Sequence, residues 1–220
     1  MNKKQLFIII FLVAIFCCLA NVLPEEAIGK VGAFLGRVAL TFDDGPSPET
    51  TPQVIEILGK FGARATFFVV GRNVNLFPGI LREAVRSGNE IADHTYNHPK
   101  ISKLNAKMIN AQLHATQNAI FRSIGVNAKF FRPPYGAINE KASKIAQTFG
   151  LKIVMWSIDP FDWQDPAPET IEERVLSNIQ PGDIVLLHDV HRNTVYALPY
   201  ILEGLKRKGL RCVTVSELLR

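Results

Sequence analysis

The sequence has little cysteine, no internal repeat and no low-complexity segment. Only three of the 220 residues are cysteine, and two of them, Cys17 and Cys18, stand side by side in an apolar run, so that Cys212 is alone in the rest of the chain. A disulfide framework within the fold is therefore excluded. Hydrophobic residues make up 47% and charged residues 20% of the chain. This balance excludes a disordered or collagen-like protein and predicts one globular domain with a substantial core.

A strong excess of one charge is also lacking. The formal net charge is +5, and it falls to +3, from 23 basic and 20 acidic residues, once Lys3 and Lys4 are removed with an N-terminal leader. The sequence contains no block of arginine and lysine longer than three residues. We therefore expect no nucleic-acid partner, and nothing in the sequence indicates a protein partner.

Residues 1–20 have the features of an export signal. Two lysines precede an apolar stretch at 6–19, and Cys18 and Ala20 are small residues at the −3 and −1 positions of a cleavage site. The stretch is shorter than the roughly 20 residues that span a bilayer. We therefore expect cleavage after Ala20 and a periplasmic or secreted protein. The alternative is an uncleaved signal anchor that associates with the membrane through residues 5–20.

From residue 37 onward, short apolar runs alternate with longer amphipathic stretches, which is typical of repeated βα units. Crossovers of this length predict an α/β fold with parallel strands and outer helices, either an open doubly wound sheet or a distorted, incomplete (β/α) barrel of about seven strands. No linker divides the chain, so we expect a short lead-in at 21–35 and one domain at 36–220. The predicted strands are 37–42, 64–70, 89–92, 128–131, 151–157, 183–188 and 210–213. The predicted helices lie near 51–61, 78–87, 105–123, 139–149, 169–178 and 195–208.

Clusters of polar and aromatic residues follow five of the predicted strands. In βα folds the loops at the carboxyl ends of the strands meet on one face, where active sites are built. We therefore expect the five clusters to line one cleft. They are Asp43-Asp44-Gly45, His94 to His98, Arg132 to Tyr135, Asp159 to Trp163, and His188-Asp189.

The first two clusters contain the residue types of a catalytic metal site. The carboxylates of Asp43 and Asp44 repel one another unless a cation or an arginine neutralises their charge. Gly45 after them allows the backbone to turn. Asp-Asp-Gly-Pro is also ordinary turn chemistry, so this motif alone does not decide the matter. His94 and His98, at i and i+4, lie one helical turn apart and can close on one ion. With Asp44 they make a two-histidine, one-carboxylate site with open positions for water and substrate.

The other clusters supply an arginine, an indole and a further histidine. Arg132 precedes two prolines that set the direction of the backbone, as they would also in a rigid surface turn. An arginine at a strand end needs a carboxylate, and Asp43 and Asp162 are the two candidates. His188 by itself could be an ordinary core histidine, but an aspartate that holds one ring nitrogen makes it a candidate general acid. Trp163 is expected to wall the cleft.

In this order the clusters closely resemble the motifs of the polysaccharide deacetylase family, also called the NodB-homology domain or carbohydrate esterase family 4. The resemblance covers about residues 36–219. It implies a distorted (β/α) barrel and metal-dependent removal of N-acetyl groups from amino sugars of peptidoglycan, chitin or a related polysaccharide. The implied cofactor is one divalent ion, Zn²⁺ first, with Co²⁺, Mn²⁺ or Ni²⁺ as alternatives. The motifs are TFDDG at 41–45, HTYNH at 94–98, RPPY at 132–135, DPFDW at 159–163 and LLH at 186–188.

The resemblance also implies a role for each motif residue. Asp43 would be the base, Asp44, His94 and His98 the metal ligands, Arg132 the partner of Asp43, the Tyr135 N–H an oxyanion donor, His188 the acid, Asp162 its partner, and Trp163 and Leu186 the walls of the acetyl pocket. Asp93 departs from the residue common in relatives and is expected to add a hydrogen bond near the metal or alter metal preference. His191 lies outside the motifs.

Two other functions remain as alternatives. The first is a glycan-binding protein that keeps the barrel but has lost turnover. Such a protein should lack a ligand, the base or the acid, and none of these is missing. The second is an amide hydrolase that acts on a small ureide or a formylated sugar. The export signal disfavours the ureide.

Overall fold

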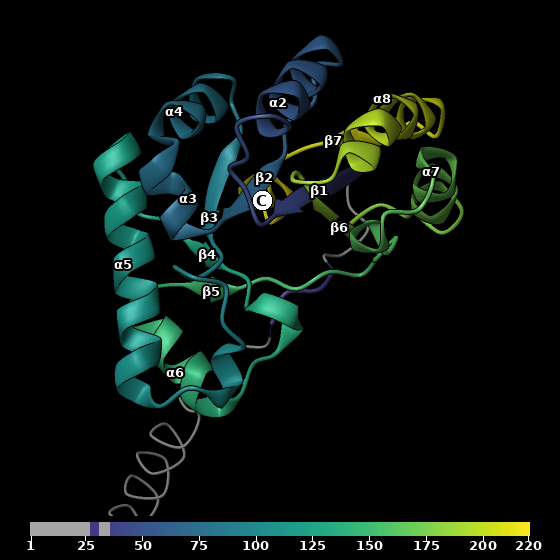
Figure 1. Cartoon of the computed structure of the whole chain (residues 1–220). Coiled ribbons are helices and arrows are strands. Elements are labelled where there is room, and N and C mark those ends of the chain that lie inside the picture. The colour runs from purple at the N-terminus through teal and green to yellow at the C-terminus, as the bar shows by residue number, and fades with distance from the viewer. Residues whose placement is uncertain (1–26, 31–35) are drawn as a thin grey trace, which may run out of the picture.

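The structure, a computed structural model, describes residues 27–30 and 36–220, so the predicted export signal at 1–20 lies outside the described residues. Parallel strands lie at the centre and helices surround them (Figure 1). The strands are β1 (Arg37–Asp43), β2 (Thr66–Val69), β3 (Glu90–Asp93), β4 (Phe130–Phe131), β5 (Lys152–Ile153), β6 (Ile184–His188) and β7 (Arg211–Cys212). The helices are α2 (Thr51–Lys60), α3 (Gly71–Leu76), α4 (Pro78–Arg86), α5 (Ala106–Ile124), α6 (Glu140–Thr148), α7 (Pro168–Leu176), α8 (Arg192–Arg207) and α9 (Val215–Leu218), with 3-10 turns η1 (Ile101–Lys103), η2 (Pro134–Gly136) and η3 (Asp162–Gln164).

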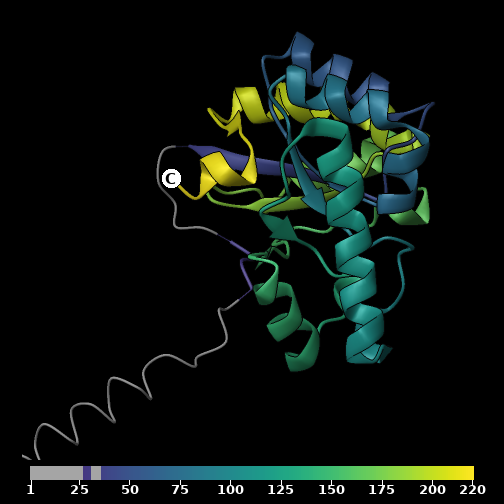
Figure 2. The ribbon, with the colours of Figure 1, turned by 90° about the vertical axis from the view of Figure 1, so that its left-hand side faces the viewer.

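The sheet has the strand order β5-β4-β3-β2-β1-β6, and β7 pairs with the start of β1. All of these pairs are parallel. Parallel neighbours need long crossovers, which the helices supply, and Figure 2 shows from the side how the helices stand outside the strands. β1 lies between β2 and β6 and is covered on both faces, which explains why Val38, Ala39, Leu40 and Phe42 are all fully buried.

Irregular segments, rather than a strand pair, connect the outer strands β5 and β6. Residues 27–30 lie in this gap, where Ile28 N donates to Ile153 O at 2.9 Å. These contacts close the curl of the sheet only partly, so the fold is a distorted, incomplete (β/α) barrel, which is one of the two architectures that the residue pattern left open and the one that the resemblance implied. The isolated bridges in the gap are Ile28 with Val154, Lys30 with Asp183, and Ile158 with Val185.

The fifth strand is much shorter than the predicted 151–157. It ends at Ile153, and beyond it the carbonyl oxygens of Val154 and Met155 accept hydrogen bonds from the Arg132 guanidinium at 3.2 and 2.8 Å. The apolar run of 151–157 thus extends beyond the end of β5, where its residues surround the buried Arg132. α3 and α9 were not predicted, since helices of six and four residues are too short to show a helical period.

The helices bury one face each against the sheet. In α8, Val195, Leu198, Ile201, Leu202 and Leu205 recur at helical spacing and are nearly or fully buried. Within the described ranges, no helix is both long and apolar enough to cross a membrane.

Candidate active site

Residues from all five clusters line one cavity, as expected, and four of the clusters begin at or directly after the end of a strand, whereas Asp159 to Trp163 follow an irregular segment beyond β5. Asp43 ends β1 and His188 ends β6, and the two residues are partners in the register of these strands. His94 directly follows β3, and Arg132 directly follows β4. Asp43 and His188 are therefore neighbours although 145 positions separate them in the chain.

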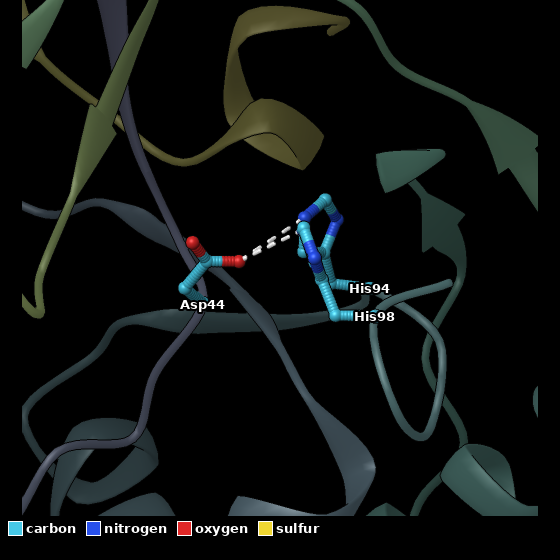
Figure 3. Close-up of side chains that lie close together, drawn as sticks. All are labelled: Asp44, His94 and His98. Carbon is cyan, nitrogen blue, oxygen red and sulfur yellow. Dashed lines mark ion pairs between the residues drawn. The ribbon is translucent and has the colours of Figure 1, made fainter. Parts of the chain in front are cut away.

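Asp44, His94 and His98 lie close enough together to hold one metal ion (Figure 3). Asp44 Oδ1 is 3.2 Å from His98 Nε2 and 3.5 Å from His94 Nε2, and one ligand atom from each residue lies within 4.8 Å of the others. No described donor gives Asp44 Oδ1 a hydrogen bond, although this atom is buried. A carboxylate oxygen and the unprotonated nitrogen of a neutral imidazole are both acceptors, so all three side chains could bind one divalent cation.

His94 is held in the orientation and charge state that a metal ligand needs. Its side chain is 3% exposed, and its Nδ1 donates to the backbone oxygen of Arg132 at 2.8 Å, which leaves Nε2 toward Asp44. Burial lowers the pKa of His94 to about 3, and the nearby Asp44 charge only partly opposes this. The ring is therefore neutral at ordinary pH and able to bind a cation.

The segment that carries both histidines is a loop, so the expectation of one helical turn was wrong. Thr95 and His98 have φ of 65° and 58°, in the left-handed region. Two backbone N–H groups of the loop donate to Gln112 Oε1 of α5 at 2.9 Å, and His98 N donates to the Thr95 hydroxyl at 3.1 Å. These contacts bring the two rings to a centroid distance of 5.0 Å without a helix.

Asp93 and His191, whose roles the sequence left open, take different positions. Asp93 Oδ1 accepts from Thr95 N at 2.8 Å and Oδ2 accepts from Gln117 of α5 at 2.9 Å, so both of its oxygens support the loop. The His191 ring lies edge-on to His188 with the centroids 5.9 Å apart. Asp93 thus holds the backbone that carries the histidines.

The turn after β1 also differs from the expectation for Gly45. The left-handed φ of 75° belongs to Asp44, and Gly45 is not among the residues with positive φ. Aspartate tolerates this region better than most residues. Hydrogen bonds of 2.9 Å from Asn73 Nδ2 to Asp44 O and from Val70 N to Gly45 O hold the turn in place.

Arg132 is fully buried, and of its two candidate partners it contacts Asp43 rather than Asp162. Its Nη1 donates to Asp43 Oδ1 and to the Thr41 hydroxyl oxygen, each at 2.8 Å. The guanidinium also lies 4.1 Å from the centroid of the Phe68 ring, within cation–π range. Arg132 therefore fixes one oxygen of Asp43. From the end of β4 it connects β1 with the segment that follows β5.

The other oxygen of Asp43 faces Asp44, His94 and His98, the candidate metal cluster. Asp43 Oδ2 is 3.7 Å from His94 Nε2. Burial raises the pKa of Asp43, while the charges of Arg132 and His188 work in the opposite direction. The carboxylate is thus a stronger base than a solvated aspartate, and it lies beside the three side chains that could hold an ion.

Asp162 is the partner of His188, as the resemblance implied. Its Oδ1 is 2.8 Å from His188 Nδ1, and its Oδ2 accepts from His188 N and the Thr194 hydroxyl, each at 2.7 Å. Burial works against the imidazolium, but the hydrogen bond and charge of Asp162, with smaller contributions from Asp43 and Asp44, raise the pKa of His188 to about 9. His188 is therefore mostly protonated at neutral pH and able to donate a proton.

A cavity of about 400 Å³ opens over these groups. Trp163, Leu186 and Tyr135 line it, as expected, and the Tyr135 ring lies edge-on to His98 at a centroid distance of 4.7 Å. Trp156 also lines the cavity. The sequence did not single out this tryptophan because it ends an apolar run that is typical of a strand. The cavity therefore brings Asp43, His188 and the three side chains that could hold a metal ion to one small space.

A buried carboxylate, a protonated imidazole and a group of side chains able to hold a cation, at the carboxyl ends of parallel strands, are suited to metal-assisted hydrolysis. The polysaccharide deacetylase family model matches residues 35–154, and the chain belongs to this family.

Known proteins that resemble this chain support the family assignment. A peptidoglycan-N-acetylglucosamine deacetylase of Bacillus cereus is 42% identical over 188 residues, which cover 83% of this chain and 88% of that protein. The peptidoglycan-N-acetylglucosamine deacetylase PgdA of Listeria monocytogenes is 38% identical over 182 residues, but this chain spans only 38% of its length. Among solved structures, a CE4 family pseudoenzyme from Bacillus anthracis superposes with a TM-score of 0.85 at 32% identity, over 92% of this chain and 71% of that one.

Proposed function

We propose that this protein is an exported, metal-dependent hydrolase that removes N-acetyl groups from amino sugars of a cell-wall or extracellular polysaccharide, with peptidoglycan or chitin oligomers as substrates. The observation that carries the proposal is the cavity in which the Arg132-bound Asp43, the Asp162-bound His188 and the metal cluster lie together. The relatives named as peptidoglycan deacetylases support the substrate class. The leader at 1–20 supports export.

The ion that Asp44, His94 and His98 would hold is most simply Zn²⁺, because two imidazoles and one carboxylate are usual ligands of catalytic zinc. When bound, such an ion supplies an acidified water and polarises the amide carbonyl. Asp43 takes the proton from the attacking water, with Arg132 holding its other oxygen in place. The Tyr135 N–H donates to the oxyanion. Loss of one such donor typically costs about 2.7–4 kcal/mol of transition-state stabilisation.

His188 completes the reaction by protonating the leaving amine. An amide anion is too basic to depart alone, so the proton must arrive as the C–N bond breaks. The Asp162 carboxylate holds Nδ1, which leaves Nε2 as the ring nitrogen that can donate. Trp163 and Leu186 enclose the acetyl methyl group.

A non-catalytic glycan-binding protein is the second candidate function. The observation that favours it is that one structural relative is a CE4 family pseudoenzyme. Such a protein would need none of the proton-transfer groups. The burial of the Asp43–Arg132 ion pair and the strong perturbation of the pKa of His188 support catalysis instead, because both are costly to maintain without a function.

The test is to incubate the purified protein with muropeptides and with chitooligosaccharides and to follow loss of acetyl by mass spectrometry. We expect deacetylation that chelation abolishes and that added Zn²⁺ or Co²⁺ restores. His94→Ala and His98→Ala should lose bound metal and activity together, whereas His114→Ala, which removes an exposed histidine of α5, should keep both. Full activity in a metal-stripped sample contradicts the metal assignment, and bound glycan without loss of acetyl favours the second candidate.

A further inference from the structure

Asp189 is a fully buried carboxyl group to which the proposed reaction gives no role. It directly follows His188, the last residue of β6. Its Oδ2 accepts a hydrogen bond from the Thr51 hydroxyl, the first residue of α2. No donor in the described part of the chain reaches its Oδ1. A buried carboxyl group with only one of its oxygens bonded to a side chain is costly, so its position calls for an explanation.

Gly45 lies directly against this carboxyl group. A Cβ atom at Gly45 would come 2.2 Å from Asp189 Oδ2, 2.5 Å from Oδ1 and 2.7 Å from Cγ. Real Cβ contacts are never this short, and Gly45 has no positive φ that would require glycine. The glycine after the two aspartates is therefore needed to make room for Asp189.

We propose that Asp189 is a positioning residue for the metal site, which packs against Gly45 and so holds the backbone that carries Asp44. This inference rests on the proposed function, in which Asp44 is a metal ligand. The ligand itself has a left-handed φ of 75°, a conformation that needs support from its surroundings.

The hydrogen bonds around Asp189 extend the support to the whole turn. Ser47 N donates to the Thr51 hydroxyl oxygen at 2.7 Å, and that hydroxyl in turn donates to Asp189. The turn after β1, the start of α2 and the end of β6 are thus tied at one point. Because Asp189 and His188 are consecutive, the same contact also sets the distance between Asp44 and the proposed acid.

Metal affinity is the direct measure of this role, and it does not depend on deacetylation. We expect Asp189→Ala to weaken Zn²⁺ binding by about 10- to 100-fold, the usual effect of removing a residue that orients a ligand. Competition with a chromophoric chelator measures the change. Asp189→Asn keeps the size and an acceptor for the Thr51 hydroxyl, and it should stay within about threefold of the parent, well below that range. Thr51→Val removes the donor and should weaken binding in the same direction as Asp189→Ala.

Asp183 provides a matched control at the opposite end of β6. It is also a buried carboxylate, and it is bonded to Lys30 and Ser157. Asp183→Ala should lower the thermal stability of the metal-free protein without changing its affinity for Zn²⁺. Far-UV circular dichroism and melting of each metal-free variant separate loss of the fold from loss of the site.

A double substitution tests the contact with Gly45. Gly45→Ala should weaken Zn²⁺ binding, because the new Cβ and the Asp189 carboxyl cannot both keep their places. In Gly45→Ala/Asp189→Ala this clash is absent, so the double variant should bind Zn²⁺ no more weakly than Asp189→Ala alone.

Any of the following results from the variants would overturn the inference: unchanged affinity in Asp189→Ala, additive losses in the double variant, or a loss in Asp189→Asn as large as in Asp189→Ala. Absence of measurable Zn²⁺ binding by the parent protein would overturn it as well. If the parent binds Zn²⁺ but does not deacetylate glycans, the proposed function fails while the positioning role of Asp189 stands on the affinity data.

Discussion

Replacing Asp162 by asparagine should move the alkaline limit of activity to lower pH. In the parent structure Asp162 is fully buried, and both of its oxygens contact His188, one through the ring nitrogen and one through the backbone N–H. Asparagine keeps the size and an acceptor oxygen but removes the negative charge. The burial of His188, which opposes the imidazolium, remains.

The size of the effect follows from the pKa of His188. The rise from 6.5 to about 9 corresponds to about 3 kcal/mol in favour of the imidazolium, at about 1.36 kcal/mol per pKa unit. Asp162 is the main cause of the rise, so its loss should bring the pKa to about 6.5 or below. At pH 8 the protonated fraction then falls from about 0.9 to about 0.03, which is an approximately 30-fold loss of the active acid.

Two measurements check this prediction. Nuclear magnetic resonance titration of the imidazole signals of metal-free protein should give a pKa near 9 for His188 in the parent and a much lower value in Asp162→Asn. The pH profile of kcat should be bell-shaped in the parent, because one group must be protonated and another deprotonated. In Asp162→Asn the alkaline limb should shift downward, so that most of the loss appears at pH 8 and little near pH 5.

Thr194→Val is the matched control. It removes one hydrogen bond to Asp162 Oδ2 but leaves the carboxylate charge, so the alkaline limb should move far less. His188→Ala should lower kcat strongly and flatten the alkaline limb, with KM changed much less. An alkaline limb that is unchanged in both Asp162→Asn and His188→Ala, or a large rise in KM with kcat intact, would refute the assignment of His188 as the acid.

Other predictions concern the base, its arginine and the leader. Asp43→Asn should keep bound Zn²⁺ yet lower kcat by at least about 100-fold, because it removes a base and not a ligand; if its metal content by mass spectrometry fell as far as in Asp44→Asn, the two roles would have to be exchanged. Arg132→Met should lower the free energy of unfolding by roughly 3–5 kcal/mol in denaturant titrations, because it leaves a buried carboxylate unpaired; a loss below about 1 kcal/mol would contradict this reasoning. Protein recovered from the native host should begin near Asn21, whereas Met1 in a soluble cytoplasmic fraction would refute export and a membrane-bound form would indicate a signal anchor.

Much of the architecture could be predicted from local patterns. Each of the seven strands overlaps a predicted range and extends at most one residue beyond it, and six of the described helices match a predicted one. The meeting of the five clusters was predictable too, because parallel strands joined by crossovers all end on the same face. Neither inference needed a distance between residues far apart in the sequence.

Local patterns were insufficient where a residue depends on neighbours from elsewhere in the chain. The i, i+4 spacing of His94 and His98 indicated a helical turn, yet Gln112 of α5 holds them in a loop. The apolar run that ends at Trp156 resembled a strand, yet the carbonyl oxygens of Val154 and Met155 within it accept hydrogen bonds from Arg132. In both places a long-range hydrogen bond overrides the local preference of the backbone.

The sequence by itself determined which residue types follow which strand, and therefore the composition of the site and the face on which it lies. The residues alone left the pairing within that set open: the family resemblance implied Arg132 with Asp43 and Asp162 with His188, and the tertiary structure forms these two contacts and adds Asp189 with Gly45. The physical reason is that residue order controls strand direction and burial, whereas these pairs depend on separations of a few ångströms between strand ends. The curl of the sheet and the packing of α2, α5 and α8 around it set those separations.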